Sequence, residues 1–428
     1  MHTLSDDVAR SLTVFPGASN GEFNLPPELS LVITEGNGCE LWDSGGKRYL
    51  DFSMGWGSSL VGHARPEVVA AVTRQAPRGS NFAYVNANSL ALGEEIRRLS
   101  PACDRVRFCA SGTEATMYCQ RIARAYTGRT KILKFEGAYH GANEVGVTSL
   151  FPRRLLDFPR PDPSSAGIPE RTADDILVAP YNDADTAGRI IREHAAELAA
   201  VIVEPLQRCT PPRPGFLPAL RDVCSGHGVL LIFDEVVTGF RLAYGGAQEY
   251  YGVIPDLVAY GKALGGGYPI GAFGGAEDIM DIVREDRSDA PQYVWVASTL
   301  GGNPVSCAAA LAALAVFRQP GTYDDLHARG AYLREGMARV LRDNEMVAQV
   351  IGDGPLAQVV FSDSVVFDYR STRRGDAKLG RALMLGLFSR GIFLNPMGTK
   401  LYLSLAHTTD HCDEFLACFG ETLKAISS

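Results

Sequence analysis

Charged side chains follow two strongly apolar runs of this sequence, which is an unusual place for them. Asp234 and Glu235 come directly after GVLLIF, and Lys262 follows DLVAYG. A carboxylate at the end of a buried strand is costly unless it meets a cation or strong hydrogen-bond donors. A buried lysine has a lowered pKa, and its neutral amine is the nucleophile that carbonyl chemistry requires.

A turn of small residues follows a third run, RVRF, and opens a stretch with helical character. It reads Ala110-Ser111-Gly112-Thr113-Glu114. At a helix start, backbone N–H groups and the positive end of the helix dipole point to one place, which suits a phosphate dianion. Ser and Thr are also ordinary helix caps, so this turn alone leaves both interpretations open.

Each of these charged groups has an alternative interpretation. Asp234 could bind Mg²⁺ as in a Walker B strand or pair with Lys262 in a structural salt bridge, and the glycines after Lys262 resemble a nucleotide loop. However, the sequence has no G-x-x-x-x-G-K-[ST] motif, and no G-x-G-x-x-G turn follows its first strand. Taken together, the three groups match the three parts of pyridoxal 5′-phosphate that a protein binds. Residues 111–113 would bind its phosphate, Asp234 its pyridine nitrogen and Lys262 its aldehyde.

Short apolar runs alternate with helical stretches between about residues 105 and 275. The runs are almost continuously hydrophobic, as in strands covered on both faces. Strands are predicted at 105–108, 131–135, 199–205, 228–235, 256–260 and 270–275, and helices at 112–128 and 216–228. This alternation predicts an α/β fold with a mainly parallel sheet and helices on both faces, in which ligands gather at the carboxyl ends of the strands.

Three parts are expected along the chain. Residues 1–52 form an N-terminal segment with short β-strands, including an antiparallel pair within 31–52 that turns at 43–46. Residues 53–312 form the large cofactor-binding domain, which ends in an Ala-rich helix from about 303. Residues 313–428 form a smaller α+β domain, with a short strand predicted at 364–370.

Composition excludes several classes of protein. Of 428 residues, 46% are hydrophobic and 21% charged, which is ordinary for a chain that folds throughout. The net charge is −8 and no basic run marks a phosphate-backbone track, so nucleic acid is not an expected partner. No apolar run approaches the roughly 20 residues that span a bilayer, and the N-terminus lacks a signal peptide. We expect a cytoplasmic protein with no membrane partner.

Cysteine and histidine usage gives no sign of a metal or a disulfide framework. The nine cysteines are an odd number without a C-x-x-C pair, so we expect reduced core residues. His407 and His411 are four apart, but no Glu follows His407 as in H-E-x-x-H. No metal is predicted, and this segment is interpreted as a surface helix start.

Four segments carry a family resemblance. They are SGTEATMYCQRIARAYTGRTKILKFEGAYHG (111–141), LIFDEVVTGFR (231–241), PDLVAYGKALGGGYPIGAFGG (255–275) and STLGGNP (298–304). The sequence closely resembles the class III pyridoxal-phosphate aminotransferases, and within them the branch of glutamate-1-semialdehyde 2,1-aminomutase and its aminotransferase relatives. The similarity runs from about Pro16 to His407. It implies fold type I and a homodimer with active sites at the subunit interface.

The resemblance also implies roles by motif position. Lys262 would bind the cofactor aldehyde and shuttle a proton, and Asp234 would keep the pyridine nitrogen protonated. Tyr139 would stack on one face of the ring and Val236 would pack on the other. The remaining cofactor-binding residues would be Ser111, Gly112, Thr113, His140, Glu204 and, from the partner subunit, Thr299. Trp56 would line the substrate pocket.

The substrate machinery departs from the family pattern. An Arg that would grip a substrate carboxylate is missing from the segment after Pro16-Gly17, and Gly398-Thr399-Lys400 replaces a gating Glu. LQRC after Glu204-Pro205 also differs from the aminomutase pattern. These changes favour a ping-pong aminotransferase with an amino donor and a separate carbonyl acceptor over the aminomutase.

The nature of the substrate follows from the same departures. Glu22 could hold an ammonium or hydroxyl groups, which suggests an amino-sugar substrate without a carboxylate, unless Arg208 or Arg241 replaces the missing clamp. An aminomutase, or an epimerase or isomerase of the same fold, remains the alternative. A cofactor-free scaffold should have lost some of the cofactor groups, and all are present.

Overall fold

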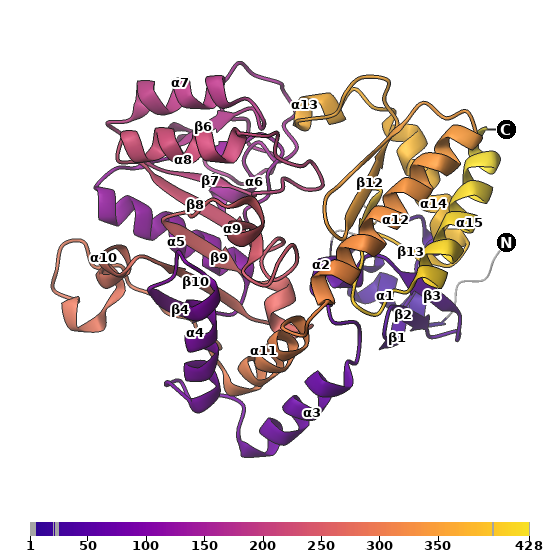
Figure 1. Ribbon diagram of the computed structural model, residues 1–428, viewed down its shortest axis with the longest axis horizontal. Helices are drawn as coiled ribbons and strands as arrows, with labels where there is room; N and C mark the ends of the chain where they lie inside the picture. The colour runs from indigo at the N-terminus through magenta and orange to yellow at the C-terminus, as the bar shows by residue number, and fades with distance from the viewer. Residues whose placement is uncertain (1–5, 20, 22–24, 396–397, 428) are drawn as a thin grey trace. The chain divides into compact units, whose positions relative to one another are not determined.

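The structure of the protein is a computed structural model that describes residues 6–19, 21, 25–395 and 398–427. The chain divides into two compact units (Figure 1). One unit comprises residues 67–318 and 367–369. The other comprises residues up to 66 together with 319–366 and 370–428. It therefore joins segments from both ends of the chain, whereas the three-part division expected from the sequence stays a prediction.

A seven-stranded sheet forms the centre of the unit built from residues 67–318. Its strand order is β4-β10-β9-β8-β7-β5-β6. Strands β6, β5, β7, β8 and β9 pair in parallel, and β10 pairs antiparallel with both β9 and β4. The strands are β4 (Arg105–Cys109), β5 (Lys131–Phe135), β6 (Ile176–Ala179), β7 (Leu198–Val203), β8 (Leu230–Glu235), β9 (Leu257–Tyr260) and β10 (Gly271–Gly275). The predicted α/β fold with a mainly parallel sheet is confirmed.

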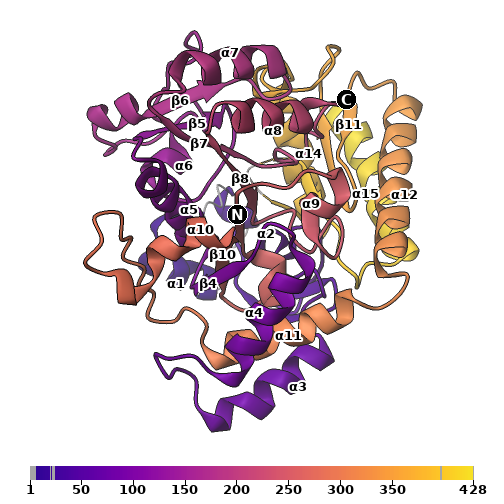
Figure 2. The same cartoon turned by 60° about the vertical axis from the view of Figure 1, so that its left-hand side comes forward.

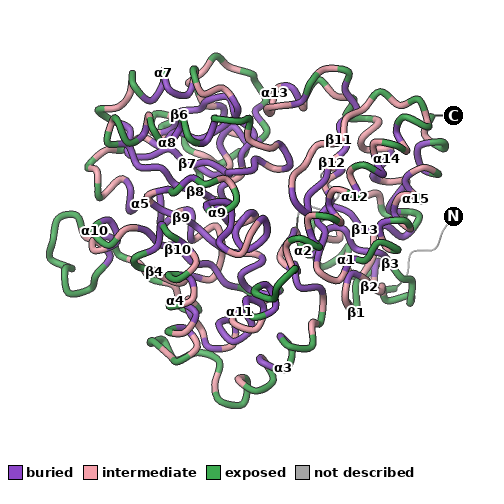
Figure 3. The backbone as a smooth tube through the Cα atoms, in the orientation of Figure 1, coloured by how far each residue is buried: buried purple, intermediate pink, exposed green. Residues whose placement is uncertain are grey.

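The strands in the middle of this sheet are covered on both faces. Every residue of β7 and of β8 is buried (Figure 3). This explains their continuous hydrophobic runs, since neither face meets water. Six strands were predicted, and the seventh, β6, was missed because its four residues ILVA are too short a run to stand out in the sequence.

Helices pack against the sheet and fix the strand ends (Figure 2). Helix α5 (Gly112–Thr127) contacts β4, β7, β8, β9 and β10, and α8 (Phe216–Gly226) contacts β8 and α7 (Ala184–His194). The other α-helices of this unit are α3 (Pro66–Gln75), α4 (Ala87–Leu99), α6 (Glu144–Val147), α9 (Gly246–Tyr251), α10 (Glu277–Met280) and α11 (Pro304–Phe317). The two predicted helices, 112–128 and 216–228, are confirmed to within two residues.

The other unit contains two smaller sheets. Strands β1 (Ile33–Asn37), β2 (Glu40–Asp43), β3 (Arg48–Asp51) and β13 (Ile392–Phe393) form one sheet, in which β13 is parallel to β3. Strands β11 (Gln349–Ile351), β12 (Leu356–Val360) and β14 (Lys400–Tyr402) form the other. Its α-helices are α1 (Asp6–Val14), α2 (Met54–Gly57), α12 (Thr322–Asp343), α14 (Ala377–Ser389) and α15 (Thr409–Ser427).

Two sequence predictions in these segments need correction. The expected turn at 43–46 joins β2 to β3, as predicted, but β1 adds a third strand. The prediction of a strand at 364–370 is wrong. The side-chain amide of Gln349 instead bonds the backbone there, donating to Ser364 O at 2.6 Å and accepting from Val366 N at 3.2 Å. A side chain thus takes the place of a strand partner, and residues 369–372 form the short helix α13 (Tyr369–Thr372).

The histidine segment was also interpreted wrongly. His407 is fully buried rather than on a surface helix start, and it precedes α15. Its Nδ1 accepts from Ser404 N at 3.0 Å, and burial lowers its pKa to about 3. Within the described residues, no group of three His, Cys, Asp or Glu side chains is arranged to hold a metal ion.

The cysteines agree with the sequence interpretation. All nine are free thiols, and all but the half-buried Cys418 are buried. Burial raises the pKa of several of them, for example that of Cys103 to about 12, which keeps these thiols protonated and unreactive. Among the described helices, none is long and apolar enough to cross a membrane.

Candidate active site

The parallel arrangement brings four loops to one edge of the large sheet. Strands β5, β7, β8 and β9 are neighbours and run in the same direction. Their carboxyl ends carry, in strand order, Tyr139 with His140, Glu204, Asp234 and Lys262. Residues separated by more than 120 positions therefore meet at the edge where ligands of such sheets bind.

Lys262 occupies a strained position directly after β9 and Gly261. Its φ is +44°, in the left-handed region that non-glycine residues seldom adopt. Such strain persists where surrounding structure enforces it, often at functional sites. Desolvation lowers the pKa of Lys262, the negative charges of Asp234 and Glu204 oppose that shift, and part of the side chain stays accessible. Burial thus shifts Lys262 toward the neutral amine, the form that reacts with a carbonyl.

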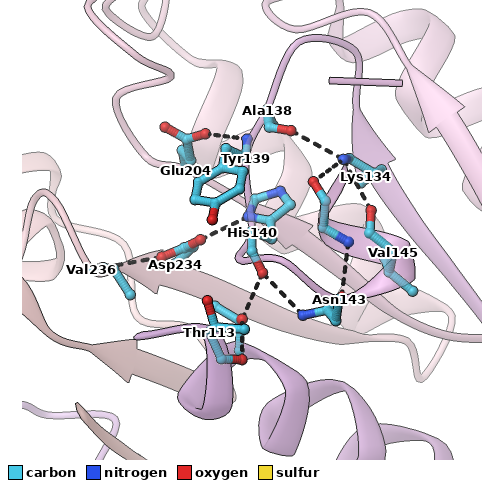
Figure 4. A network of polar contacts seen from close by, with 12 residues as sticks. Thr113, Lys134, Ala138, Tyr139, His140, Asn143, Val145, Glu204, Asp234 and Val236 are labelled. Atoms are coloured by element: carbon cyan, nitrogen blue, oxygen red, sulfur yellow. Dashed lines mark hydrogen bonds and ion pairs between the residues drawn. The ribbon is translucent and has the colours of Figure 1, made fainter. Parts of the chain in front are cut away.

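Asp234 is buried at the end of β8 and is held by two donors. Its Oδ2 lies 2.8 Å from Nδ1 of His140, and its Oδ1 accepts from Val236 N at 3.1 Å (Figure 4). His140 is itself fully buried, and its carbonyl accepts from Thr116 Oγ1 at 2.7 Å. The imidazole fixes the orientation of the carboxylate and compensates for its desolvation.

Val236 is held by close contacts with two glycines. A Cβ at Gly112 would lie 2.7 Å from Val236 Cγ1, and one at Gly261 would lie 3.3 Å from the same atom. Only glycine at position 112 lets the start of α5 approach the end of β8 so closely. The contact also links the residue before Lys262 to the first residue of α5.

The N-terminus of α5 presents donors without partners. Ser111 is the N-cap, and its Oγ accepts from Glu114 N at 3.2 Å. The N–H groups of Gly112 and Thr113 donate to no acceptor in the described part of the chain. The side chain of Thr113 faces the same region, since its Oγ1 accepts from Ala142 N at 3.3 Å. This is the arrangement that a phosphate group satisfies.

Glu204 ties the loop after β7 to the loop after β5. Its Oε1 accepts from Tyr139 N at 2.7 Å, and its Oε2 accepts from Arg208 N at 3.1 Å. The guanidinium of Arg208 lies over the Tyr139 ring, 5.6 Å from its centre. Figure 4 shows Tyr139 beside Glu204, with His140 and Asp234 next to them. The backbone carrying Tyr139 is thereby fixed from two sides.

The side chain of Lys134 holds the loop after β5 in place. It is fully buried, and its Nζ lies 2.6 to 3.0 Å from four carbonyl oxygens, those of Ala138, Val145, Gly146 and Thr148. Burial lowers its pKa to about 7. One side chain thus binds both arms of the loop that carries Tyr139 and His140.

We expect Lys134→Met to lower the free energy of unfolding by about 3–5 kcal/mol, because it removes an ammonium whose three N–H groups are shared among four buried carbonyls, of which Gly146 O alone has another backbone donor among the described residues, His140 N at 3.4 Å. The midpoint of denaturant unfolding measures this loss. Lys131→Met on the same strand is the matched control. Lys131 Nζ has one carbonyl partner, Asp174 O, and Glu197 at 3.7 Å, so a loss below about 1 kcal/mol is expected. Equal losses in both variants would contradict the role of Lys134.

The remaining predicted site residues are not brought to this edge by any contact described. Thr299 is exposed, and its carbonyl accepts from Asn81 Nδ2 at 3.1 Å. Trp56 belongs to the other unit, where it has a positive φ of +57° in α2. Glu22 lies outside the described residues. The roles expected for these three residues stay predictions.

Sequence reasoning missed one residue of the site and left another unassigned. Lys134 was counted as an ordinary strand residue, although its place between Leu133 and Phe135 in a continuous apolar run was a signal of burial. Arg208 was named only as a possible substitute for the missing carboxylate clamp. Nothing in its local sequence showed that it contacts Tyr139.

The site fits the cofactor that the sequence suggested. In the described part of the chain, the unpaired N–H groups at the start of α5 suit a phosphate, the buried Asp234 suits a protonated pyridine nitrogen, and the lowered pKa of Lys262 suits an amine that reacts with an aldehyde. In the described residues, Nε2 of His140 has no hydrogen-bond partner, so the polar network beside Asp234 is not closed by protein alone. Fold and site together define a pyridoxal-phosphate enzyme of fold type I.

The chain belongs to the class-III aminotransferase family, since the family model described as Aminotransferase class-III matches residues 24–423. Pyridoxal 5′-phosphate is its cofactor. A similar curated protein is the glutamate-1-semialdehyde 2,1-aminomutase of Symbiobacterium thermophilum. It is 40% identical over 397 residues, which cover 91% of this chain and 89% of that protein.

Solved structures of similar proteins include two transaminases. An omega-transaminase from Sphaerobacter thermophilus is 34% identical with a TM-score of 0.93, covering 100% of this chain and 98% of that one. A β-phenylalanine aminotransferase from Variovorax paradoxus is 32% identical with a TM-score of 0.86, covering 98% and 93%. The fold and the enzyme class expected from the sequence are confirmed.

Proposed function

We propose that this chain is an aminotransferase that moves an amino group from an amino donor to a separate carbonyl acceptor in two half-reactions. The observation that carries the proposal is the meeting of Lys262, Asp234 and the start of α5 at one sheet edge. When bound, pyridoxal phosphate supplies an aldehyde that reacts with amines and a ring that withdraws electrons from the substrate carbon. The side chains of the protein would hold the cofactor in place and transfer the protons.

In this proposal the protein holds the cofactor at three places. The N–H groups of Gly112 and Thr113, with the cap at Ser111, bind the phosphate at the positive end of α5. Asp234 keeps a proton on the pyridine nitrogen, and His140 holds Asp234 in place through the 2.8 Å contact. Tyr139 and Val236 would contact the two faces of the ring.

Lys262 performs the proton transfers. Its Nζ would hold the cofactor through the aldehyde in the absence of substrate, and once free it would take and return the proton at the substrate carbon. Burial favours this role because it stabilises the neutral amine, which is the form that accepts a proton. Tyr139, placed by Glu204, lies within the same network.

A second candidate function is glutamate-1-semialdehyde 2,1-aminomutation, in which the amino group moves within one molecule. The name of the Symbiobacterium relative supports this candidate. The names of the two solved transaminases support transfer between molecules. The amino-sugar substrate expected from the sequence has no support in these comparisons.

One experiment separates the two candidates. The holoenzyme is mixed with single amines, and the absorbance of its cofactor is followed together with release of the deaminated product. Intermolecular transfer predicts stoichiometric conversion of the cofactor and release of a carbonyl product. Aminomutation predicts turnover of glutamate-1-semialdehyde alone to the isomer that carries its amino group at C1. Turnover of the semialdehyde without any reaction toward external amines would refute the first candidate.

We also propose that the protein is a homodimer. Four large apolar side chains are exposed beside the segment that contains Thr299: Phe82, Tyr84, Val85 and Leu300. These four residues form the apolar patch. The segments that carry them lie together, because Asn81 bonds Thr299 O and Asn86 bonds Gly302 O at 2.8 Å. Contiguous exposed apolar surface marks an interaction site, and a second copy of the chain would cover it.

Val85→Arg is expected to convert the dimer to monomer, because Val85 is 71% exposed in the single chain and the proposed dimer would bury the introduced charge. Light scattering during size-exclusion chromatography measures the mass. Leu155→Arg, at an exposed leucine outside the patch, should leave the mass unchanged. If both Val85→Arg and Tyr84→Arg remain dimeric, the patch is not the interface.

A further inference from the structure

The loop after β7 carries a cation at the active-site edge, and its terminal nitrogens have no acceptor among the residues that the structure describes. Arg208 is half-buried, and its Nε donates to Gly137 O at 3.3 Å. Among the described residues, no carboxylate comes within ion-pair distance of its guanidinium, and its two terminal nitrogens make no hydrogen bond. Glu204 is the nearby carboxylate, but its oxygens accept from backbone N–H groups.

The backbone around this residue is built to hold it. Arg208 has a φ of +61°, in the left-handed region, where a non-glycine residue is strained by about 1–2 kcal/mol. The turn is closed by Thr210 N donating to Gln207 O at 2.8 Å, and Gln207 Nε2 donates to Glu136 O at 2.7 Å. A surface arginine without a role needs no such support.

The guanidinium also lies beside Tyr139 at the active-site edge. It lies over the ring of Tyr139, and its charge acts on Lys262, whose protonation it disfavours. Arg241, the other arginine considered from the sequence, is fully buried and donates its Nε to Val237 O at 2.9 Å. It is therefore shielded from a substrate, whereas Arg208 remains accessible.

We propose that Arg208 is the residue that recognises the carboxylate of the substrate, and that the substrates are accordingly amino acids or keto acids rather than simple amines. This inference rests on the proposed amino-transfer function. With Nε bonded to Gly137 O, the two terminal nitrogens form the planar pair that binds a carboxylate through two charge-assisted hydrogen bonds. Arg208 thus takes the role that the segment after Pro16-Gly17 lacks.

The test compares two unreactive ligands that share one carbon skeleton, one ending in a carboxylate and the other in a neutral carboxamide. 3-Phenylpropanoate and its neutral amide, 3-phenylpropanamide, are titrated into the holoenzyme and binding is measured by calorimetry. The parent enzyme should bind the acid more tightly than the amide. Arg208→Met should weaken binding of the acid about 30-fold or more and leave the amide unchanged. Arg208→Lys should recover only part of the loss, because ammonium lacks the planar pair.

Arg213→Met is the matched control. It removes the same charge from the same loop, where the Arg213 guanidinium lies 4.0 Å from the centre of the Phe367 ring, and it should not alter the preference. Equal weakening of acid and amide in Arg208→Met would show a purely structural role and overturn the proposal. So would a parent enzyme that does not prefer the acid. Failure of the proposed amino-transfer function gives a different result from failure of the Arg208 proposal, because the cofactor absorbance would then respond to no added amine.

Discussion

Replacing Lys262 by alanine is expected to lower turnover on the order of 10⁴-fold or more, because in the proposed function this one side chain would both hold the cofactor aldehyde and move the proton at the substrate carbon. The buried amine with its lowered pKa would supply these two functions. Lys134 also lies in one of the segments that resemble the family, but its Nζ is enclosed by four carbonyl oxygens and is therefore not placed to bind the cofactor.

Mass spectrometry gives an independent measure of this assignment. Borohydride reduction of the holoenzyme should fix the mass of the reduced cofactor on the peptide that contains Lys262 and nowhere else. Lys131→Ala serves as the matched control, since it should retain both the label and turnover. A label recovered on Lys131, Lys134 or Lys400 would refute the assignment of Lys262.

Asp234→Asn is expected to lower turnover on the order of 10²–10³-fold while the cofactor remains bound. Asparagine keeps the size of the side chain but removes the charge that holds a proton on the pyridine nitrogen. Its oxygen or amide can still meet Val236 N or His140, so the fold of the edge should survive. Phosphate binding by the start of α5 and attachment to Lys262 do not depend on this charge.

Two measurements separate this effect from loss of the site. Cofactor content by absorbance should stay close to one per chain in Asp234→Asn, and the unfolding midpoint should fall by only a few degrees. Glu235→Gln is a suitable comparison, because Glu235 is the adjacent buried carboxylate but bonds Ala247 N, Gln248 N and Thr238 Oγ1 instead of the site. It should lose stability rather than turnover. Near-normal turnover in Asp234→Asn would mean that another group protonates the ring.

The sequence alone determined the fold class, the cofactor and the enzyme family of this protein. Runs such as LAAVIV and LLIF are apolar at every position because the strands are covered on both faces, so the pattern itself reveals a parallel α/β sheet. Asp234 and Lys262 interrupt that pattern at strand ends, where a buried charge has to serve a purpose. These signals are local, and local signals are readable from one chain.

The tertiary structure alone decided which distant residues share the site and what each contacts. The strand order places β7 between β5 and β8, which brings Arg208 over Tyr139 and His140 against Asp234 across 94 positions of sequence. The tertiary structure also buries two residues that the sequence analysis interpreted differently. His407 was expected at the surface, and Arg241 was a candidate for binding the substrate carboxylate. No local pattern encodes these outcomes, because they depend on strand order and on the packing of loops from different strands.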